Sequence, residues 1–142
     1  MRKKIIFCIL ILVSLTFNSC EENIGQDLFK TNENKVIVDS DLFRIATSEN
    51  YTITNVELDN DILNITIATS GCNGETFKAV LIDSNIMLAS LPPQRQLRLV
   101  LEKREDCEAL ISKTFPFDIK LLKEPSSEII LNLEGWQNQI KY

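Results

Sequence analysis

The fold of this chain is decided by residues 51–69, which read YTITNVELDNDILNITIAT. On both sides of the centre, apolar and polar residues alternate with a period of two, which places successive side chains on opposite faces of an extended strand. The centre is Asp59-Asn60-Asp61, residue types that accept left-handed backbone geometry and bond their own backbone. The pattern predicts a β-hairpin over these residues. A slip in its phase near Asn55 predicts a bulge in the first strand.

The rest of the chain repeats this period in short segments that are about ten residues apart. The clearest are 36–38, 62–69, 77–82, 96–103, 115–121 and 129–134. Residues 83–85 are expected to break a strand, residues 86–91 to form a short strand or a loop, and residues 42–46 to extend or flank the first strand. Residues 107–112 are expected to begin another strand or form a short helical turn. The spacing predicts about seven or eight short strands and no helix, and thus an all-β, antiparallel, immunoglobulin-like β-sandwich, with a small closed barrel as the alternative.

The first nineteen residues form a leader. Arg2, Lys3 and Lys4 are followed by an apolar run of thirteen residues, 5–17. A helix of that length rises roughly 20 Å, whereas the hydrocarbon core of a membrane is about 30 Å thick. The run is therefore too short to span a membrane stably, and it predicts a signal peptide over residues 1–19. A transmembrane anchor is the alternative.

The leader ends at Ser19-Cys20, which resembles the processing site of bacterial lipoproteins. An ordinary signal peptidase prefers a small residue three positions before the cut, where this chain has Phe17. The resemblance implies that Cys20 becomes the new N-terminus and carries diacylglycerol on its thiol and an acyl chain on its amine. Two or more acyl chains anchor a protein stably. Cys20 is thus the expected lipidation site and the membrane the expected partner.

Two acids, Glu21 and Glu22, follow Cys20. They resemble the start of surface lipoproteins from the Bacteroides–Flavobacterium group, and the chain as a whole resembles the small uncharacterised lipoproteins of that group. The resemblance implies an outer-membrane lipoprotein that faces the periplasm or the cell exterior. Residues 20–34 are polar and are expected to form a flexible tether, on which Leu28 and Phe29 could dock back to the domain. Residues 35–142 are the predicted β domain.

Composition narrows the function. Without the leader the chain has 12 Lys and Arg against 20 Asp and Glu, a net charge of −8, which argues against nucleic acid as a partner. The chain has no histidine, so Ser-His-Asp and Cys-His catalysis and the usual zinc sites are excluded. We expect no cofactor, no metal and no enzymatic activity. The expected role is a non-enzymatic binding or structural accessory of the cell envelope, with a small carboxylate-based enzyme as an alternative.

Two cysteines, Cys72 and Cys107, remain once the leader and its lipid site are set aside. An even pair in an exported protein predicts a disulfide. The loop it would close has about 36 residues, for which chain entropy gives roughly 4 kcal/mol as an upper figure. A free reactive thiol at Cys72 is the alternative.

A possible binding loop surrounds the first of these cysteines and consists of Ser70, Gly71, Asn73 and Gly74. It would offer backbone amides to a protein or glycan partner; the alternative is a hairpin turn held by the disulfide. Residues 72–77 also resemble the Cys-x-x-Gly stretch of periplasmic inhibitors of c-type lysozyme. That resemblance implies an alternative function as an inhibitor of a secreted hydrolase.

Other candidate site residues are acids and aromatics near expected turns. Asp39 with Asp41, and Asp59 with Asp61, have a spacing that can suit calcium, but the full calcium-loop pattern is absent, and we interpret them as solvated turn acids. Trp136 with Tyr142, and Phe43 with Tyr51, are aromatic pairs that could stack on a sugar or else belong to the core.

Overall fold

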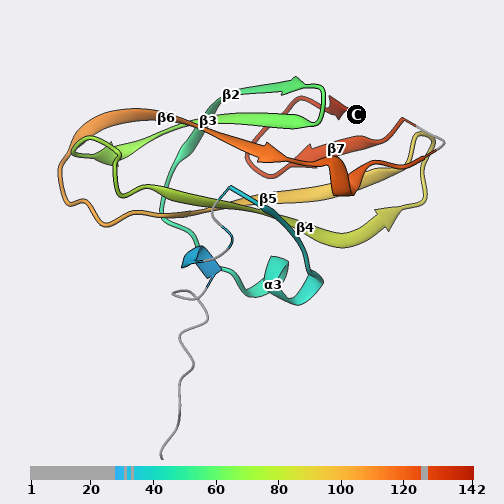
Figure 1. The fold of residues 1–142 in the computed structure, drawn as a ribbon, viewed down its shortest axis with the longest axis horizontal. Helices are drawn as coiled ribbons and strands as arrows, with labels where there is room; N and C mark the ends of the chain where they lie inside the picture. Colours follow the sequence, from blue (N-terminus) through green and yellow to red (C-terminus); the bar gives the residue numbers. More distant parts are fainter. Residues whose placement is uncertain (1–27, 31, 33, 126–127) are drawn as a thin grey trace, which may run out of the picture.

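The computed structural model describes residues 28–30, 32, 34–125 and 128–142, and its described strands form two sheets packed face to face (Figure 1). The three-stranded sheet has the order β2 (Thr52–Asp59), β3 (Ile62–Gly71), β6 (Ala109–Asp118). The five-stranded sheet has the order β1 (Val36–Val38), β4 (Lys78–Leu88), β5 (Gln94–Glu102), β7 (Ile130–Leu133), β8 (Ile140–Lys141). The prediction of an all-β sandwich is confirmed, and the described strands do not close into the small barrel that was its alternative.

The hairpin predicted from residues 51–69 is formed by β2 and β3. The strands are antiparallel with Leu58 opposite Leu63, and Asn60 has a φ of 54° in the turn between them. The register shifts between Ile53 and Asn55, where the sequence predicted a bulge. The prediction succeeded because all of these features are local.

The alternating pattern of β3 places one set of side chains between the sheets. Leu63, Ile65 and Ile67 are fully buried, whereas Asn64 and Thr66 on the opposite face are partly exposed. Phe115 and Phe117 of β6 face Ile65 and Leu63 in register and extend this buried layer. The inner faces of the two sheets therefore form one hydrophobic core.

The five-stranded sheet is covered on both faces. Residues 79–82 of β4 form a continuous apolar run that is fully buried, as expected for a strand without a solvent face. Ala79 and Leu81 contribute to the core between the sheets, and Val80 and Ile82 to a second cluster on the outer face. Leu28 and Phe29 lie in that second cluster, so the described part of the predicted tether includes two residues that dock on the domain.

A short helix, α3 (Ser40–Ile45), covers the same outer face (Figure 1). The expectation that residues 42–46 extend or flank a strand, and that no helix forms, was wrong here. Asp39 is the N-cap, and its Oδ1 accepts hydrogen bonds from the amides of Asp41 and Leu42 at 2.9 and 2.8 Å. Six residues are too few to display a helical period, so only the cap could have identified this helix. A 3₁₀ turn, η1, also forms over Lys120–Leu122.

Three further expectations about the strands are corrected. Two pairs, β1 with β4 and β5 with β7, are parallel, because the chain passes through the other sheet between their members and can return in the same direction. Residues 83–85 do not end a strand: β4 continues to Leu88 with a register shift between Asp83 and Met87. Residues 109–118 form a single strand, β6, rather than two elements.

Candidate functional site

The predicted disulfide between Cys72 and Cys107 is present, with the two Cα atoms 4.9 Å apart. Cys72 lies in the connection from β3 to β4, and Cys107 in the connection from β5 to β6. Both connections carry the chain from one sheet to the other. The disulfide therefore ties the two crossings together at one end of the sandwich, which we call the disulfide end (residues 70–77 and 103–108). Cys72 is accordingly not the free thiol of the alternative.

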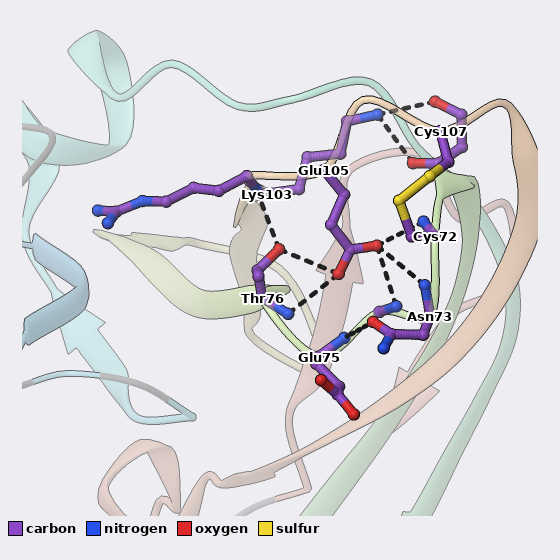
Figure 2. Close-up of a disulfide and its surroundings, with 10 residues drawn as sticks. Cys72, Asn73, Glu75, Thr76, Lys103, Glu105 and Cys107 are labelled. Atoms are coloured by element: carbon purple, nitrogen blue, oxygen red, sulfur yellow. Dashed lines mark hydrogen bonds between the residues drawn. A yellow bond between two sulfur atoms is a disulfide. The ribbon is translucent and has the colours of Figure 1, made fainter.

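A carboxylate occupies the predicted binding loop (Figure 2). Oε2 of Glu105 accepts hydrogen bonds from the amides of Cys72, Asn73 and Gly74 at 2.6, 3.2 and 3.1 Å. Oε1 accepts from the amide and the hydroxyl of Thr76, both at 3.1 Å. Successive amides of this kind form a concave anion site, and here the anion comes from the chain itself.

The amide contacts change the acidity of Glu105. Desolvation raises the pKa of this carboxyl, but the hydrogen bonds from the amides of Thr76, Gly74, Cys72 and Asn73 outweigh it and lower the pKa from 4.5 to about 2. Glu105 is therefore ionised throughout the neutral range. The signal for this contact was absent from the local sequence, because the loop and Glu105 are about thirty residues apart.

The four residues of the predicted binding loop all have structural contacts. Ser70 accepts two hydrogen bonds from Lys103 Nζ, and Asn73 Oδ1 accepts one from the amide of Glu75. Gly74 has a φ of 75°, and a Cβ on Gly71 would lie 2.5 Å from the ring of Phe77. The contacts are those of a turn held by the bridge, and ligand binding by this loop stays a prediction.

A groove of about 550 Å³ lies between the start of β2, the middle of β5 and the end of β7. Tyr51 donates a hydrogen bond to the carbonyl of Leu99 at 2.7 Å, and burial followed by the charge of Glu134 raises the pKa of its phenol to about 12. Arg98 forms an ion pair with Glu134 at 2.5 Å and lies over the ring of Phe43 at 4.5 Å. The polar groups of this groove thus bind one another.

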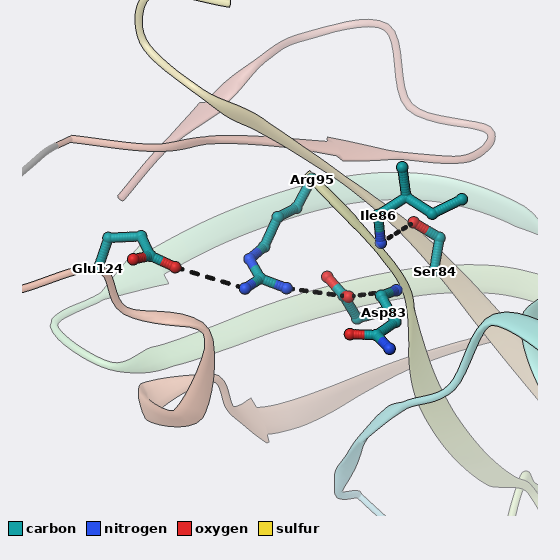
Figure 3. A network of polar contacts seen from close by, with 6 residues as sticks. Asp83, Ser84, Ile86, Arg95 and Glu124 are labelled. Carbon is teal, nitrogen blue, oxygen red and sulfur yellow. Dashed lines mark hydrogen bonds and ion pairs between the residues drawn. The ribbon is translucent and has the colours of Figure 1, made fainter. Parts of the chain in front are cut away.

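A second carboxylate, that of Asp83, lies in the middle of β4 (Figure 3). The side chain of Asp83 is fully buried, and its Oδ1 accepts hydrogen bonds from the amide of Asn85 at 2.7 Å and from Arg95 Nη1 at 3.1 Å. Arg95 also contacts Glu124 at 3.4 Å. Among the described residues nothing donates a hydrogen bond to the buried Oδ2 of Asp83 or accepts one from Nε of Arg95. Desolvation raises the pKa of Asp83 despite both partners.

Beyond Asp83 the chain forms the hairpin tip, which we define as residues 84–94. It contains four exposed aliphatic side chains: Ile86, Met87, Leu88 and Leu91, with exposed fractions of 54, 41, 42 and 99%. The sequence indicates no function here, because an apolar run next to two prolines resembles an ordinary short strand or loop. The solvent exposure of these four side chains cannot be read from the sequence, and it is what distinguishes the tip from an ordinary strand end.

The acidic candidates are bound within the fold. Asp39 caps α3, Asp41 pairs with Arg44 at 2.8 Å, and Oδ1 of Asp61 accepts hydrogen bonds from Tyr142 at 2.8 Å and Lys123 at 3.0 Å. The bonds from Tyr142 and Lys123 lower the pKa of Asp61. In the described ranges no three acidic or sulfur ligands come together as a possible metal site.

The aromatic candidates pack on the domain rather than forming a common platform. Trp136, Tyr142 and Tyr51 are partly buried against the core between the sheets, and Phe43 belongs to the cluster on the outer face. Burial and the hydrogen bond to Asp61 raise the pKa of Tyr142.

The predicted lipidation site Cys20 and the predicted leader lie outside the described residues, as does most of the predicted tether. Within the described part of the chain, no helix has the length and apolar character needed to cross a membrane.

Comparison with known proteins relates the fold to structures from the Bacteroides group. No protein-family model and no curated protein matches the sequence. A NigD-like immunity protein from Bacteroides caccae is similar in structure, with a TM-score of 0.56 and 9% identity over 78% of this chain. A DUF1344 protein of unknown function from Bacteroides vulgatus (TM-score 0.52, 13% identity) and a putative toxin-related protein from Parabacteroides distasonis (0.51, 17%) also match over 78%. The matches cover 59, 55 and 61% of those proteins, so the chain is similar in fold to part of each.

Proposed function

We propose that this protein is a non-enzymatic binding protein that lipid on Cys20 holds at the bacterial outer membrane. The leader and the Ser19-Cys20 site support the anchor. The likeness in fold to proteins from Bacteroides and Parabacteroides supports the bacterial group that the acids after Cys20 indicate.

One observation carries the binding role: the ionisable groups whose pKa is shifted are held by structural partners. Glu105 accepts hydrogen bonds from the amides of the disulfide end, and Asp83 accepts one from Arg95. Asp61 and Tyr142 bind each other, and Tyr51 donates to a main-chain carbonyl. Ionisable side chains with shifted pKa values that converge on a cavity indicate catalysis. The side chains with shifted pKa values in this protein instead join loops and strands to one another. The arrangement supports a rigid scaffold that presents a surface.

The partner is proposed to be a protein. One of the structures similar to this chain is described as an immunity protein and another as toxin-related, which supports a protein partner. The net charge of −8 after loss of the leader makes nucleic acid a poor partner.

Metabolic labelling with a clickable palmitate tests the anchor. Wild-type protein is expected to incorporate the label and to sediment with outer membranes, and Cys20→Ser is expected to do neither. Cys8→Ser, which changes a cysteine within the leader, is the matched control and should keep the label. Label that persists in Cys20→Ser would overturn the lipid site.

Inhibition of a secreted hydrolase is a second candidate function. The apolar hairpin tip favours it, because a loop with exposed aliphatic side chains can enter an enzyme cleft. Purified Cys20→Ser protein without its leader, assayed against c-type lysozyme and a panel of secreted proteases, tests this candidate. The absence of inhibition across the panel removes it and leaves the binding role intact.

A further inference from the structure

The hairpin tip has the strongest unexplained exposure in the described part of the chain. Leu91 is 99% exposed at its apex, and Ile86, Met87 and Leu88 are between 41 and 54% exposed on the strand that leads to it. Beyond Asp83, β4 has only β5 as a described neighbour, so its other edge is unpaired among the described residues. Consecutive residues of a strand alternate between its faces, and Ile86, Met87 and Leu88 are all exposed, so side chains on both faces reach solvent. Single exposed apolar residues are ordinary, but a group of them on one projecting element marks an interaction site.

The base of the tip is held by a buried ion pair and by hydrogen bonds of the turn. The buried Asp83 accepts from the amide of Asn85, which has a φ of 57°, and Ser84 Oγ accepts from the amide of Ile86 at 3.3 Å. Arg95 holds Asp83 from β5, and Figure 3 shows the side chain of Ile86 pointing away from this ion pair. At the apex Ser90 Oγ donates to the carbonyl of Pro92 at 2.7 Å.

These contacts give the tip a defined shape before any partner binds. Asp83 is a fully buried carboxylate, and one of its oxygens has no hydrogen-bond partner among the described residues, so its desolvation lowers the stability of the fold. A pair of apolar side chains in place of Asp83 and Arg95 would avoid this loss. The carboxylate shapes the bulge between Asp83 and Met87, which sets the direction of the exposed side chains. A surface that is already ordered loses less conformational entropy on binding.

Charge decides which class of partner fits. Residues 84–94 contain no charged side chain in a chain of which 25% is charged. Segments that bind membrane surfaces combine aromatic residues with Lys and Arg, and the tip has neither. The net charge of −8 after loss of the leader also repels anionic lipid. A neutral aliphatic projection is complementary to an apolar, uncharged cleft on a protein.

We infer that the hairpin tip is the contact surface of this protein and inserts Leu91, with Ile86, Met87 and Leu88 around it, into an uncharged apolar cleft of a partner protein. Asp83 and Arg95 are positioning residues for this contact. The inference rests on the proposed binding function and adds the surface and the chemistry of the partner.

Site-specific photo-crosslinking in the cells that make the protein tests the contact. A photoreactive amino acid replaces Leu91 in the full, lipid-anchored chain, and in a control it replaces Leu110, which is 80% exposed on β6 at the opposite end of the molecule. The crosslinked partner and the crosslinked peptide are identified by mass spectrometry. We expect one protein, joined to position 91 through an apolar segment, and no crosslink from position 110.

Affinity measured with the purified, identified partner completes the test. Leu91→Asp should weaken binding about tenfold or more, and Leu110→Asp should change it by less than about twofold. Met87→Asp, on the same tip, should also weaken binding. Equal binding by wild type and Leu91→Asp would overturn the inference.

The other outcomes separate the inference from the proposed function. A partner crosslinked from position 110 alone overturns the tip as the surface and leaves the binding role standing; no protein crosslinked from either position overturns both. The Cys20→Ser protein without its leader is also mixed with vesicles of phosphatidylethanolamine and phosphatidylglycerol and examined by sedimentation. Vesicle binding or a dimer that Leu91→Asp abolishes would replace the partner protein by a membrane or by a second copy of the chain.

Discussion

Two carboxylates far apart in the sandwich, Glu105 at the disulfide end and Asp83 at the base of the hairpin tip, are treated by the fold in opposite ways. At the disulfide end, Glu105 receives hydrogen bonds from four amides and a hydroxyl, and the pKa of its carboxyl falls to about 2. At the base of the hairpin tip, Asp83 is fully buried beside Arg95, and its pKa is raised. The hydrogen bonds around Glu105 stabilise its ionised form. The hydrogen bonds around Asp83 offset only part of the free energy that its ionised form loses on leaving water.

We infer from this difference that the disulfide end stabilises the fold and that the hairpin tip is the contact surface. The disulfide end contains the predicted binding loop, yet the amides of this loop are bound to Glu105 and a side chain at Gly71 would collide with Phe77. The tip has an ordinary sequence, yet it leaves aliphatic side chains in water above a costly ion pair. Natural proteins tend to retain unfavourable features where function requires them.

The largest effect is expected from loss of the disulfide. Cys72→Ala with Cys107→Ala removes a bridge over a sequence separation of 35, and it should lower the free energy of unfolding by about 4 kcal/mol or somewhat less. Urea denaturation of the variant measures the change, and wild-type protein with reductant is the parallel sample. Partner binding through the tip should persist wherever the variant is folded. A variant as stable as wild type would break the assignment of this end as structural.

Arg95→Met should have the next largest effect, because it leaves the carboxylate of Asp83 buried without its cation. We expect a loss of about 3 kcal/mol at neutral pH. The pKa of Asp83 is already raised and would rise further, so protonation relieves the penalty and the deficit should shrink as the pH falls through that pKa. Denaturant unfolding at several pH values measures both. Arg104→Met, at an exposed arginine near the disulfide end, is the matched control and should stay within about 0.5 kcal/mol of wild type.

Glu105→Gln should have a smaller effect whose pH dependence has the opposite sign. A carboxyl with a lowered pKa stabilises the fold fully above its unfolded pKa, here 4.5, and this contribution is lost as the pH falls toward about 2. Wild-type protein should therefore lose stability between these values, and the Gln variant should start less stable and lose less. Asp106→Asn changes an exposed neighbouring acid and should keep the wild-type profile. Parallel profiles for wild type and Glu105→Gln would contradict the carboxylate–amide contact.

Local sequence predicted those features of the fold that residues close together in the chain determine. The hairpin of residues 51–69 and its bulge follow from alternation and turn chemistry, and the disulfide follows from counting the cysteines left after Cys20. The parallel pairs and the contact between Glu105 and the loop depend on how the chain crosses between the sheets, which no local pattern records. The tip was missed for a related reason: an apolar run indicates a strand, but only the fold shows that the aliphatic side chains of this one are exposed.

Leu91→Asp should have the smallest effect on stability and is the sharpest test of the comparison. A side chain that is 99% exposed contributes almost nothing to packing, so the free energy of unfolding should change by no more than about 0.5 kcal/mol. Leu110→Asp, at a leucine that is 80% exposed at the other end, should be equally neutral. Urea denaturation of both variants measures this, and a large loss in Leu91→Asp alone would mean that the tip packs on the domain. If both are neutral, a difference in partner binding between them comes from the contact surface, because the folded scaffold is the same in each.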